Sequence, residues 1–285
     1  MISISAKNVR DLVVNSLKIE QEALNKARMQ FCLDIGLPWE LYEEDPQKTA
    51  YICKARYKAD TKLVDAEGAR VYEGRNDFFH AIICLGQLFL IVDEQIYDWA
   101  VGKFEDCKPE WFCSFGNLRM IEEKLQQYGH CIADTHVYML PEACIEQSPQ
   151  GTKFQWYDRE EILKFKKDNI FTSAICFSQT QPDMIAVASI KEGCGSAKCY
   201  DQSQMTGMAG VSADGTYLWQ IGINVIPEAR GKSLASKLVR ELKEEILRQG
   251  KIPFYGTSES HSISQTVGLK AGFVPAWTEV YVRER

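Results

Sequence analysis

The first half of the chain changes from a helical to a strand-like spacing of apolar residues and back again. Apolar positions recur every three or four residues across 6–35, which predicts one long helix or two helices with a break. Residues 37–49 are acidic and turn-rich. The run FHAIICLG followed by QLFLIVDE, at 79–94, predicts two paired strands that meet near Gly86. The elements expected next are helices at 95–104 and 118–128 and a strand at 135–141.

The second half alternates strands and helices more regularly. A loop at 146–153, which can serve as a linker, precedes an amphipathic helix at 158–168 whose N-cap is Asp158. The strongest helical pattern lies at 231–249, where one face is apolar and the other is charged. The remaining elements expected here are strands at 184–191, 206–212, 217–225, 253–257 and 276–282 and a helix at 262–271.

These elements predict an α/β (α+β) protein with a mixed, largely antiparallel sheet flanked by helices. A chain of 285 residues holds one large domain or two smaller ones, at roughly 100–200 residues per domain. We expect two: an N-terminal α/β domain at 1–130 and a second domain at 131–285.

Composition and charge narrow the classes of partner. The net charge of -6 argues against non-specific nucleic-acid binding, which depends on lysine and arginine neutralising phosphates. The longest apolar stretch, at 78–92, is shorter than the ~20 residues that span a bilayer. The first residues lack the apolar run of a signal peptide. We therefore expect a cytoplasmic protein that binds neither nucleic acid nor membrane.

The ten cysteines do not form a recognisable metal-binding pattern. No C-x-x-C pair occurs, and the four histidines have no close cysteine pair beside them. A structural zinc site is therefore not expected. In a cytoplasmic protein these cysteines are expected to be mostly buried, reduced thiols.

The chemically informative segment is YLWQIGINVIPEARGKSLASKLVREL, at 217–242. A strand ends at Val225, Pro227 interrupts it, and a basic turn of small residues opens the following helix. The first turn of a helix has unpaired N–H groups and a partial positive charge, so this corner predicts an anion site that suits a diphosphate. The tripeptide at 231–233 matches the end of a Walker A motif, but Ile226 stands where that motif needs glycine. A nucleoside-triphosphatase is therefore excluded.

The same corner resembles the signature Q/R-x-x-G-x-G/A of the GNAT superfamily of N-acetyltransferases. The matching residues are Arg230-Gly231-Lys232-Ser233-Leu234-Ala235, with Ser233 in place of the usual glycine. The preceding Ile223-Asn224-Val225-Ile226-Pro227 is similar to the family's strand before the loop. A second element, His261 to Phe273, retains Ser264, Val267, Lys270, Gly272 and Phe273 of another family pattern. The resemblance covers about residues 131–285.

The resemblance implies that acetyl-CoA is the co-substrate, with its diphosphate at the helix start and its pantetheine arm along the main chain of Ile223 and Val225. The implied cofactor-binding residues are Ile223, Asn224, Val225, Arg230, Gly231, Lys232, Ser233, Leu234, Ala235, His261 and Ser264. The reaction it implies is direct attack of a neutral primary amine on the thioester, which needs a base and an acid. No metal is implied.

The catalytic residues are harder to assign. Many relatives place a tyrosine acid on the second helix, but this chain has Gly268 there. His261 and Tyr281 are the candidates for the acid, and Glu259 is the candidate for the base. The missing tyrosine and Ser233 leave a second hypothesis open, in which the domain binds acyl-CoA as a ligand or sensor without turning it over.

The acceptor remains unidentified, and both small-molecule amines and peptide amines fit the resemblance. A homodimer is left open. The N-terminal domain has no clear match, although its order of strands and helices allows a degenerate copy of the same fold. We expect it to supply one wall of the acceptor site.

Overall fold

The computed structural model describes residues 19–58, 61–64, 67–72, 74–143, 154–193 and 197–285. The expected linker at 146–153 and the start of the expected helix at 6–35 lie outside these residues. The chain divides into two compact units. Unit 1 comprises Met1–Tyr138 and Pro275–Arg285, and unit 2 comprises Met139–Val274. The expected domain boundary at 130/131 lies at the start of strand β6, and the last eleven residues group with unit 1.

Unit 1 is a three-layer structure. Its elements are α2 (Gln21–Ile35), α3 (Trp39–Glu44), β1 (Ala50–Lys54), β2 (Tyr57–Lys58), β3 (Thr61–Val64), β4 (Phe79–Cys84), β5 (Gln87–Val92), η1 (Glu94–Ile96), α4 (Tyr97–Phe104), η2 (Pro109–Trp111), α5 (Phe115–Gln126) and β6 (His130–Pro141). Its main sheet has the order β1-β5-β4-β12-β6, where β12 is Phe273–Glu284. Strand β1 is parallel to β5, whereas β4 is antiparallel to both β5 and β12.

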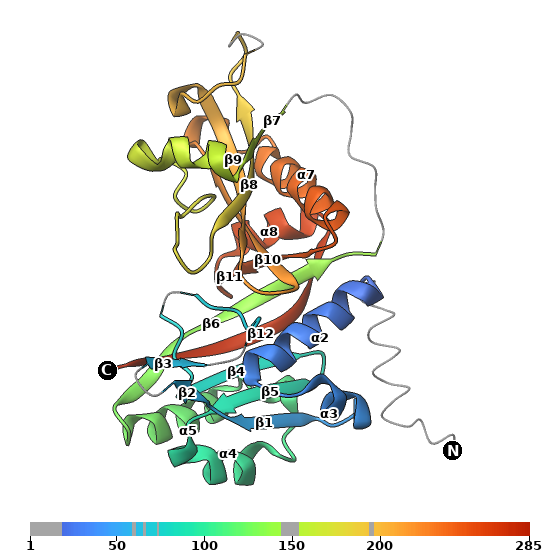
Figure 1. Ribbon diagram of the computed structural model, residues 1–285, viewed down its shortest axis with the longest axis vertical. Helices are drawn as coiled ribbons and strands as arrows, with labels where there is room; N and C mark the ends of the chain where they lie inside the picture. Colours follow the sequence, from blue (N-terminus) through green and yellow to red (C-terminus); the bar gives the residue numbers. More distant parts are fainter. Residues whose placement is uncertain (1–18, 59–60, 65–66, 73, 144–153, 194–196) are drawn as a thin grey trace. The chain divides into compact units, whose positions relative to one another are not determined.

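The alternation along β5 explains these layers. Leu88 and Leu90 pack into a core with Phe104 of α4 and Leu125 of α5. Phe89, between them, points to the opposite face and packs against Phe31 of α2, with the two ring centroids 5.6 Å apart. Strand β5 is therefore buried on both faces, which accounts for its uninterrupted apolar run. Figure 1 shows these elements within unit 1.

The β4–β5 hairpin predicted from the sequence is confirmed. Leu85 and Gly86 connect the two strands with φ angles of 45° and 76°. Two residues with positive φ form the turn type that matches the twist of a hairpin. Glycine adopts this conformation without strain, whereas Leu85 is a β-carbon-bearing residue held in it.

Unit 2 is also built in three layers. Its elements are β7 (Phe154–Asp158), α6 (Arg159–Ile162), η3 (Leu163–Asp168), β8 (Asp183–Ile190), η4 (Gln202–Gln204), β9 (Met205–Ala213), β10 (Leu218–Val225), η5 (Pro227–Ala229), α7 (Leu234–Arg248), β11 (Ile252–Thr257) and α8 (Ser262–Lys270). Strands β7 to β10 are consecutive antiparallel neighbours, and β11 lies parallel to β10. The predicted mixed, largely antiparallel sheet flanked by helices is confirmed.

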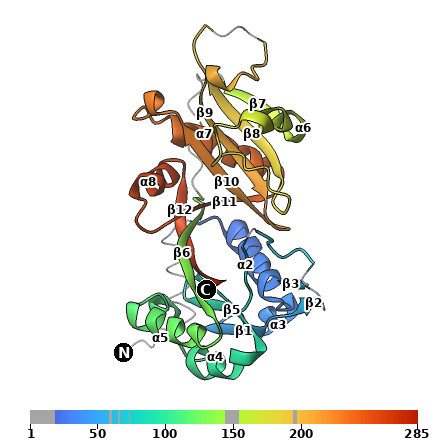
Figure 2. The same cartoon turned by 90° about the vertical axis from the view of Figure 1, so that its left-hand side faces the viewer.

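The two faces of the unit 2 sheet carry separate apolar cores. One core joins the apolar stripe of α7, including Leu238 and Leu242, to Val211 and Ile221 of the sheet. The other core joins residues 162–175 to Tyr157 and to the opposite face of β8 and β9. Figure 2 shows α6 and α7 on opposite sides of this sheet.

Three local predictions are corrected by the structure. The helix expected from residue 231 begins only at Leu234, because Gly231 and Ser233 have φ angles of 79° and 57°. The helix expected at 158–168 continues as a 3₁₀ helix after Ile162, although Asp158 forms the predicted N-cap in a capping box. The turn-rich segment at 37–49 contains the short helix α3.

Candidate functional site

Strands β10 and β11 separate before either one ends. Their parallel pairing joins Leu218 to Ile252 and ends with Gln220 opposite Phe254. Both strands are fully described, and β10 continues to Val225 while β11 continues to Thr257. On its other edge β10 stays paired with β9 up to Val225. One edge of β10 therefore loses its partner strand along its last residues.

The main-chain groups of Ile223 and Val225 point toward this open edge. The N–H of Ile226 donates to the carbonyl oxygen of Thr206, 3.1 Å away, so Ile226 directs its main chain toward β9. In an antiparallel pair this direction alternates along the strand, so Ile223 and Val225 direct their main chains the other way. The carbonyl oxygen of Val225 indeed accepts from Nε of Arg230 at 3.1 Å. This is the orientation that the predicted pantetheine contacts require.

The side chain of Asn224 serves the fold. Its Oδ1 accepts from the N–H groups of Ser173 and Ala174, at 2.6 and 3.1 Å. These residues lie so close to the sheet that a Cβ atom on Gly222 would be 1.9 Å from the carbonyl oxygen of Ser173. Asn224 thereby fixes the segment that covers the sheet face opposite α7.

Helix α7 begins with uncapped main-chain donors. Its N-cap residue, Ser233, makes no side-chain capping hydrogen bond, and no acidic residue lies in the first turn. The first N–H that finds a carbonyl within the helix is that of Lys237, which bonds Ser233. The N–H groups of Leu234 and Ala235 have no acceptor within the helix. The helix start is thus a concentration of positive potential.

The loop before α7 adds formal charge to this corner. The 3₁₀ turn η5 ends at Ala229, and the loop residues 230–233 are all exposed. Arg230 and Lys232 place two cations beside a helix start, where the dipole disfavours them unless an anion is present. Gly231 has a φ of 79°, and no atom lies within 4 Å of the position a Cβ would take. The corner is open and suited to an anion.

The second motif lies at the start of α8. His261 occupies the N-cap position, is exposed, and makes no side-chain capping bond. Glu259 is exposed just before it, and its carbonyl oxygen accepts from Nε2 of Gln265 at 2.8 Å. The Ser264 hydroxyl lies 2.8 Å from that of Tyr255 on β11. The motif residues of unit 2 thus flank the end of β11, beyond the point where it leaves β10.

Tyr255 is a residue that the sequence analysis missed. A Cβ on Gly268 would lie 2.8 Å from Sδ of Met139 and 3.1 Å from Cδ1 of Tyr255, so the space above Gly268 is filled. The phenol near this position is therefore that of Tyr255, on strand β11, and not one carried by α8. Burial raises the pKa of Tyr255. A neutral phenol can donate a proton. In the sequence, Tyr255 looked like an ordinary apolar strand residue, and no local signal distinguishes it.

Tyr281, the third catalytic candidate, belongs to unit 1. Its hydroxyl donates to Oε2 of Glu279 at 2.8 Å and is hydrogen bonded to the hydroxyl of Tyr138. Its ring stacks on His80 with centroids 5.2 Å apart. Burial and the nearby Glu279 carboxylate raise the pKa of Tyr281 well above its ordinary value. His261 and Glu259 share unit 2 with the basic loop, whereas Tyr281 does not.

Three further observations concern metal ions, membranes and cysteines. Within the described ranges, no three histidine, cysteine or acidic residues cluster in a way that would hold a metal ion. Over the same part of the chain, no helix has the length and apolar character needed to cross a bilayer. The eight cysteines that the structure describes are thiols and form no disulfide.

Comparisons with known proteins give matches among solved structures alone. No protein-family model and no curated protein matches the chain. A GNAT-family acetyltransferase from Novosphingobium aromaticivorans is 15% identical at a TM-score of 0.39, over 55% of this chain and 68% of its own. A GCN5-related N-acetyltransferase from Kribbella flavida is 13% identical at 0.39, over 76% and 90%. A tandem GNAT protein of the clavulanic acid pathway is 14% identical at 0.36, over 56% of each chain.

The chain is therefore similar to proteins of the family that its sequence motifs resemble, and it spans about half the length of the tandem protein. All three likenesses have TM-scores below 0.5.

Proposed function

We propose that unit 2 binds acetyl-CoA and transfers its acetyl group to the primary amine of an acceptor. One observation carries the proposal: within residues 218–235, a strand edge without a partner leads directly into a basic, uncapped helix start. A ligand with a diphosphate and an amide-containing arm would use both features. Its diphosphate would bind the helix start, and its arm would pair with the strand edge.

The diphosphate would accept hydrogen bonds from the first N–H groups of α7. Arg230 and Lys232 would neutralise its charge. The amide groups of the pantetheine arm would pair with the main chain of Ile223 and Val225, completing the edge that β11 leaves open. Leu234 and Ala235, both half-buried, would allow the ligand to approach the first turn closely.

The chemistry requires one proton to leave and one to arrive. The neutral amine attacks the thioester carbonyl, the C–S bond breaks, and the thiolate leaves. The amine loses a proton to a base, directly or through water, and Glu259, an exposed carboxylate just before α8, is the candidate for that base. The thiolate takes up a proton from an acid. Tyr255, whose hydroxyl is paired with Ser264, and His261 are the candidates for that acid.

The binding step is tested by reversing the charge of the loop. Arg230→Glu with Lys232→Glu should weaken acetyl-CoA binding at least a hundredfold by calorimetry, and circular dichroism should be unchanged. The matched control carries the same change in charge at the other end of α7, Arg248→Glu with Lys251→Glu, and should bind normally. An unchanged affinity in the loop variant would exclude residues 230–235 as the acetyl-CoA-binding site.

The competing function is an acyl-CoA-binding module without turnover, and the filled space above Gly268 favours it. Release of free thiol from acetyl-CoA, measured with a panel of amines, separates the two. Thiol release that depends on an amine supports the transferase. Tight binding with no release from any amine supports the module.

A further inference from the structure

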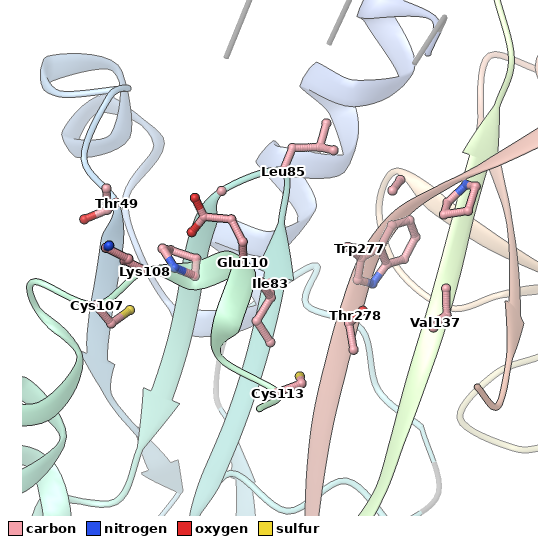
Figure 3. A pocket seen from close by; sticks show the side chains of 14 residues that line it. Thr49, Ile83, Leu85, Cys107, Lys108, Glu110, Cys113, Val137, Trp277 and Thr278 are labelled. Atoms are coloured by element: carbon pink, nitrogen blue, oxygen red, sulfur yellow. The ribbon is translucent and has the colours of Figure 1, made fainter. Parts of the chain in front are cut away.

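Unit 1 contains a cavity of about 720 Å³ that the proposed function does not use. It lies against the ends of β4, β6 and β12 and beneath the segment 107–113, which includes η2. Figure 3 shows Ile83, Thr278 and Val137 on neighbouring strands along one side of it. Ile83 and Thr278 are a cross-strand pair, so their side chains share one face of the sheet.

The cavity exists because the unit 1 core does not extend to this end of the sheet. Phe112 is fully buried in the core beside Phe104 and Leu88. Cys107, on the same segment, only packs against the edge of that core and lines the cavity. The β4–β5 turn closes one end through Leu85, which keeps its positive φ of 45°. The cavity is partly open to solvent on the side of the exposed residues Lys108 and Glu110, so a ligand could enter it.

We propose that this cavity is a binding site for an uncharged, mainly apolar small molecule. Its volume lies within the roughly 300–1,000 Å³ typical of ligand pockets. Ile83, Val137 and Leu85 supply apolar walls, while Thr49 and Thr278 place hydroxyl groups on the lining. A few polar groups on an apolar surface are the usual composition of such sites.

The charges of the lining residues indicate that the ligand is uncharged. The two charged residues of the lining, Lys108 and Glu110, have opposite signs and are both exposed, so together they contribute no net charge. Burial and the nearby Glu110 carboxylate raise the pKa of Cys107 to about 11, so its thiol stays neutral. An ionic ligand would lose its hydration without gaining a buried counter-charge, whereas a neutral ligand would not.

The test uses the full chain and the neutral fluorophore 6-propionyl-2-dimethylaminonaphthalene, whose emission shifts to the blue in apolar surroundings. Saturable binding of one probe per chain is expected. Val137→Trp and Ile83→Phe fill the cavity and should weaken binding at least tenfold. Ile83→Val keeps the space open and should bind as the native chain does. Unchanged affinity in folded filling variants, or the absence of saturable binding, would overturn the site.

A second measurement avoids mutation. Bound probe should slow alkylation of Cys107 by N-ethylmaleimide at least fivefold. It should leave the rate at Cys176, an exposed cysteine of unit 2, unchanged. Equal rates at Cys107 with and without saturating probe would place the probe elsewhere and overturn the proposal. The site does not depend on acetyl-CoA binding, so either hypothesis can fail alone.

Discussion

A fully buried charge of unit 1 and two buried charges of unit 2 are satisfied by different kinds of partner. In unit 1, Glu279 is fully buried and accepts from Arg70, His80, Trp277 and Tyr281, all at 2.6–2.8 Å. In unit 2, two buried charges, Asp183 and Lys243, are bound by main chain. Asp183 accepts from the N–H of Phe177 at 2.7 Å, and Lys243 donates to the carbonyl oxygen of Gly272 at 3.3 Å.

The polar groups of unit 1 hold the fold together, whereas some of those in unit 2 are left available to a ligand. The Glu279 network joins α2, through Asp34 and Arg70, to β4 and β12, so it fixes how distant parts of the chain meet. Burying a charge is unfavourable, and a partner of opposite charge offsets that cost only when the geometry is good. Unit 2 instead leaves donors uncovered at the start of α7, where a ligand can use them.

The largest expected effect comes from removing Glu279. Glu279→Ala leaves Arg70 and His80 buried without their common acceptor, and such a loss costs about 3–5 kcal/mol. Guanidinium unfolding followed by circular dichroism measures it. The control, Glu245→Gln, breaks the exposed pair with Arg248 in unit 2 and should cost under about 1 kcal/mol. Similar losses in the two variants would contradict the contrast between the units.

The pH dependence of stability should follow the same network. Burial opposes ionisation of Glu279, but Arg70 and His80 outweigh it and hold the pKa of Glu279 well below its usual range. Its contribution is therefore complete above the unfolded-state pKa of about 4.3 and is lost as the pH falls below it. Unfolding free energies from pH 7 down to pH 3 should show this loss. Glu279→Gln, which cannot titrate, should flatten the profile, and an unchanged profile would exclude Glu279 as its source.

Within unit 2, substitutions should cost the most stability where the segment 171–175 packs against the sheet. In Gly222→Ala the new Cβ would meet the Ser173 carbonyl oxygen at 1.9 Å, and overpacking of this kind costs about 1–3 kcal/mol. Gly231→Ala has open space around it and adds only the strain of a positive φ, about 1–2 kcal/mol. Thermal unfolding of the two variants compares them. A larger loss of stability in Gly231→Ala than in Gly222→Ala would mean that the segment 171–175 moves to accommodate the new methyl group at little cost.

The smallest effect is expected at Ser233. Ser233→Gly relieves a φ of 57°, but glycine adds backbone entropy to the unfolded chain, so the net gain should be under about 1 kcal/mol. It also restores the glycine of the acyl-CoA-binding signature, so the affinity for acetyl-CoA should stay equal or rise. Calorimetry on the purified variant measures this. A clear loss of affinity would show that the Ser233 hydroxyl itself contacts the ligand.

Local pattern determined which features the sequence could predict. The spacing of apolar residues gave the β4–β5 hairpin and α7, and Asp158 gave the N-cap of α6, because each depends on neighbours along the chain. The basic, uncapped start of α7 could be predicted for the same reason, since residues 223–235 are contiguous. Its binding of acetyl-CoA remains a prediction.

Contacts between distant residues were not predictable from spacing. Nothing in the sequence links Asp34, Arg70 and Glu279, because their meeting depends on the pairing of β12 with β4. The place of Tyr281 in unit 1, beside Glu279 and Tyr138, likewise could not be predicted from spacing. Tyr255 was overlooked because its contacts, with Ser264 and beside Gly268, are made to another element, α8.

The course of β6 and β12 has a consequence for how the protein is made. The boundary between the units falls inside both strands, and residues 275–285 complete unit 1. During synthesis, the network around Glu279 therefore cannot close until residues 275–285 have been translated. A nascent chain must carry unit 1 unfinished while all of unit 2 emerges from the ribosome, and a premature stop before codon 275 would leave unit 1 without the strand that lies between β4 and β6.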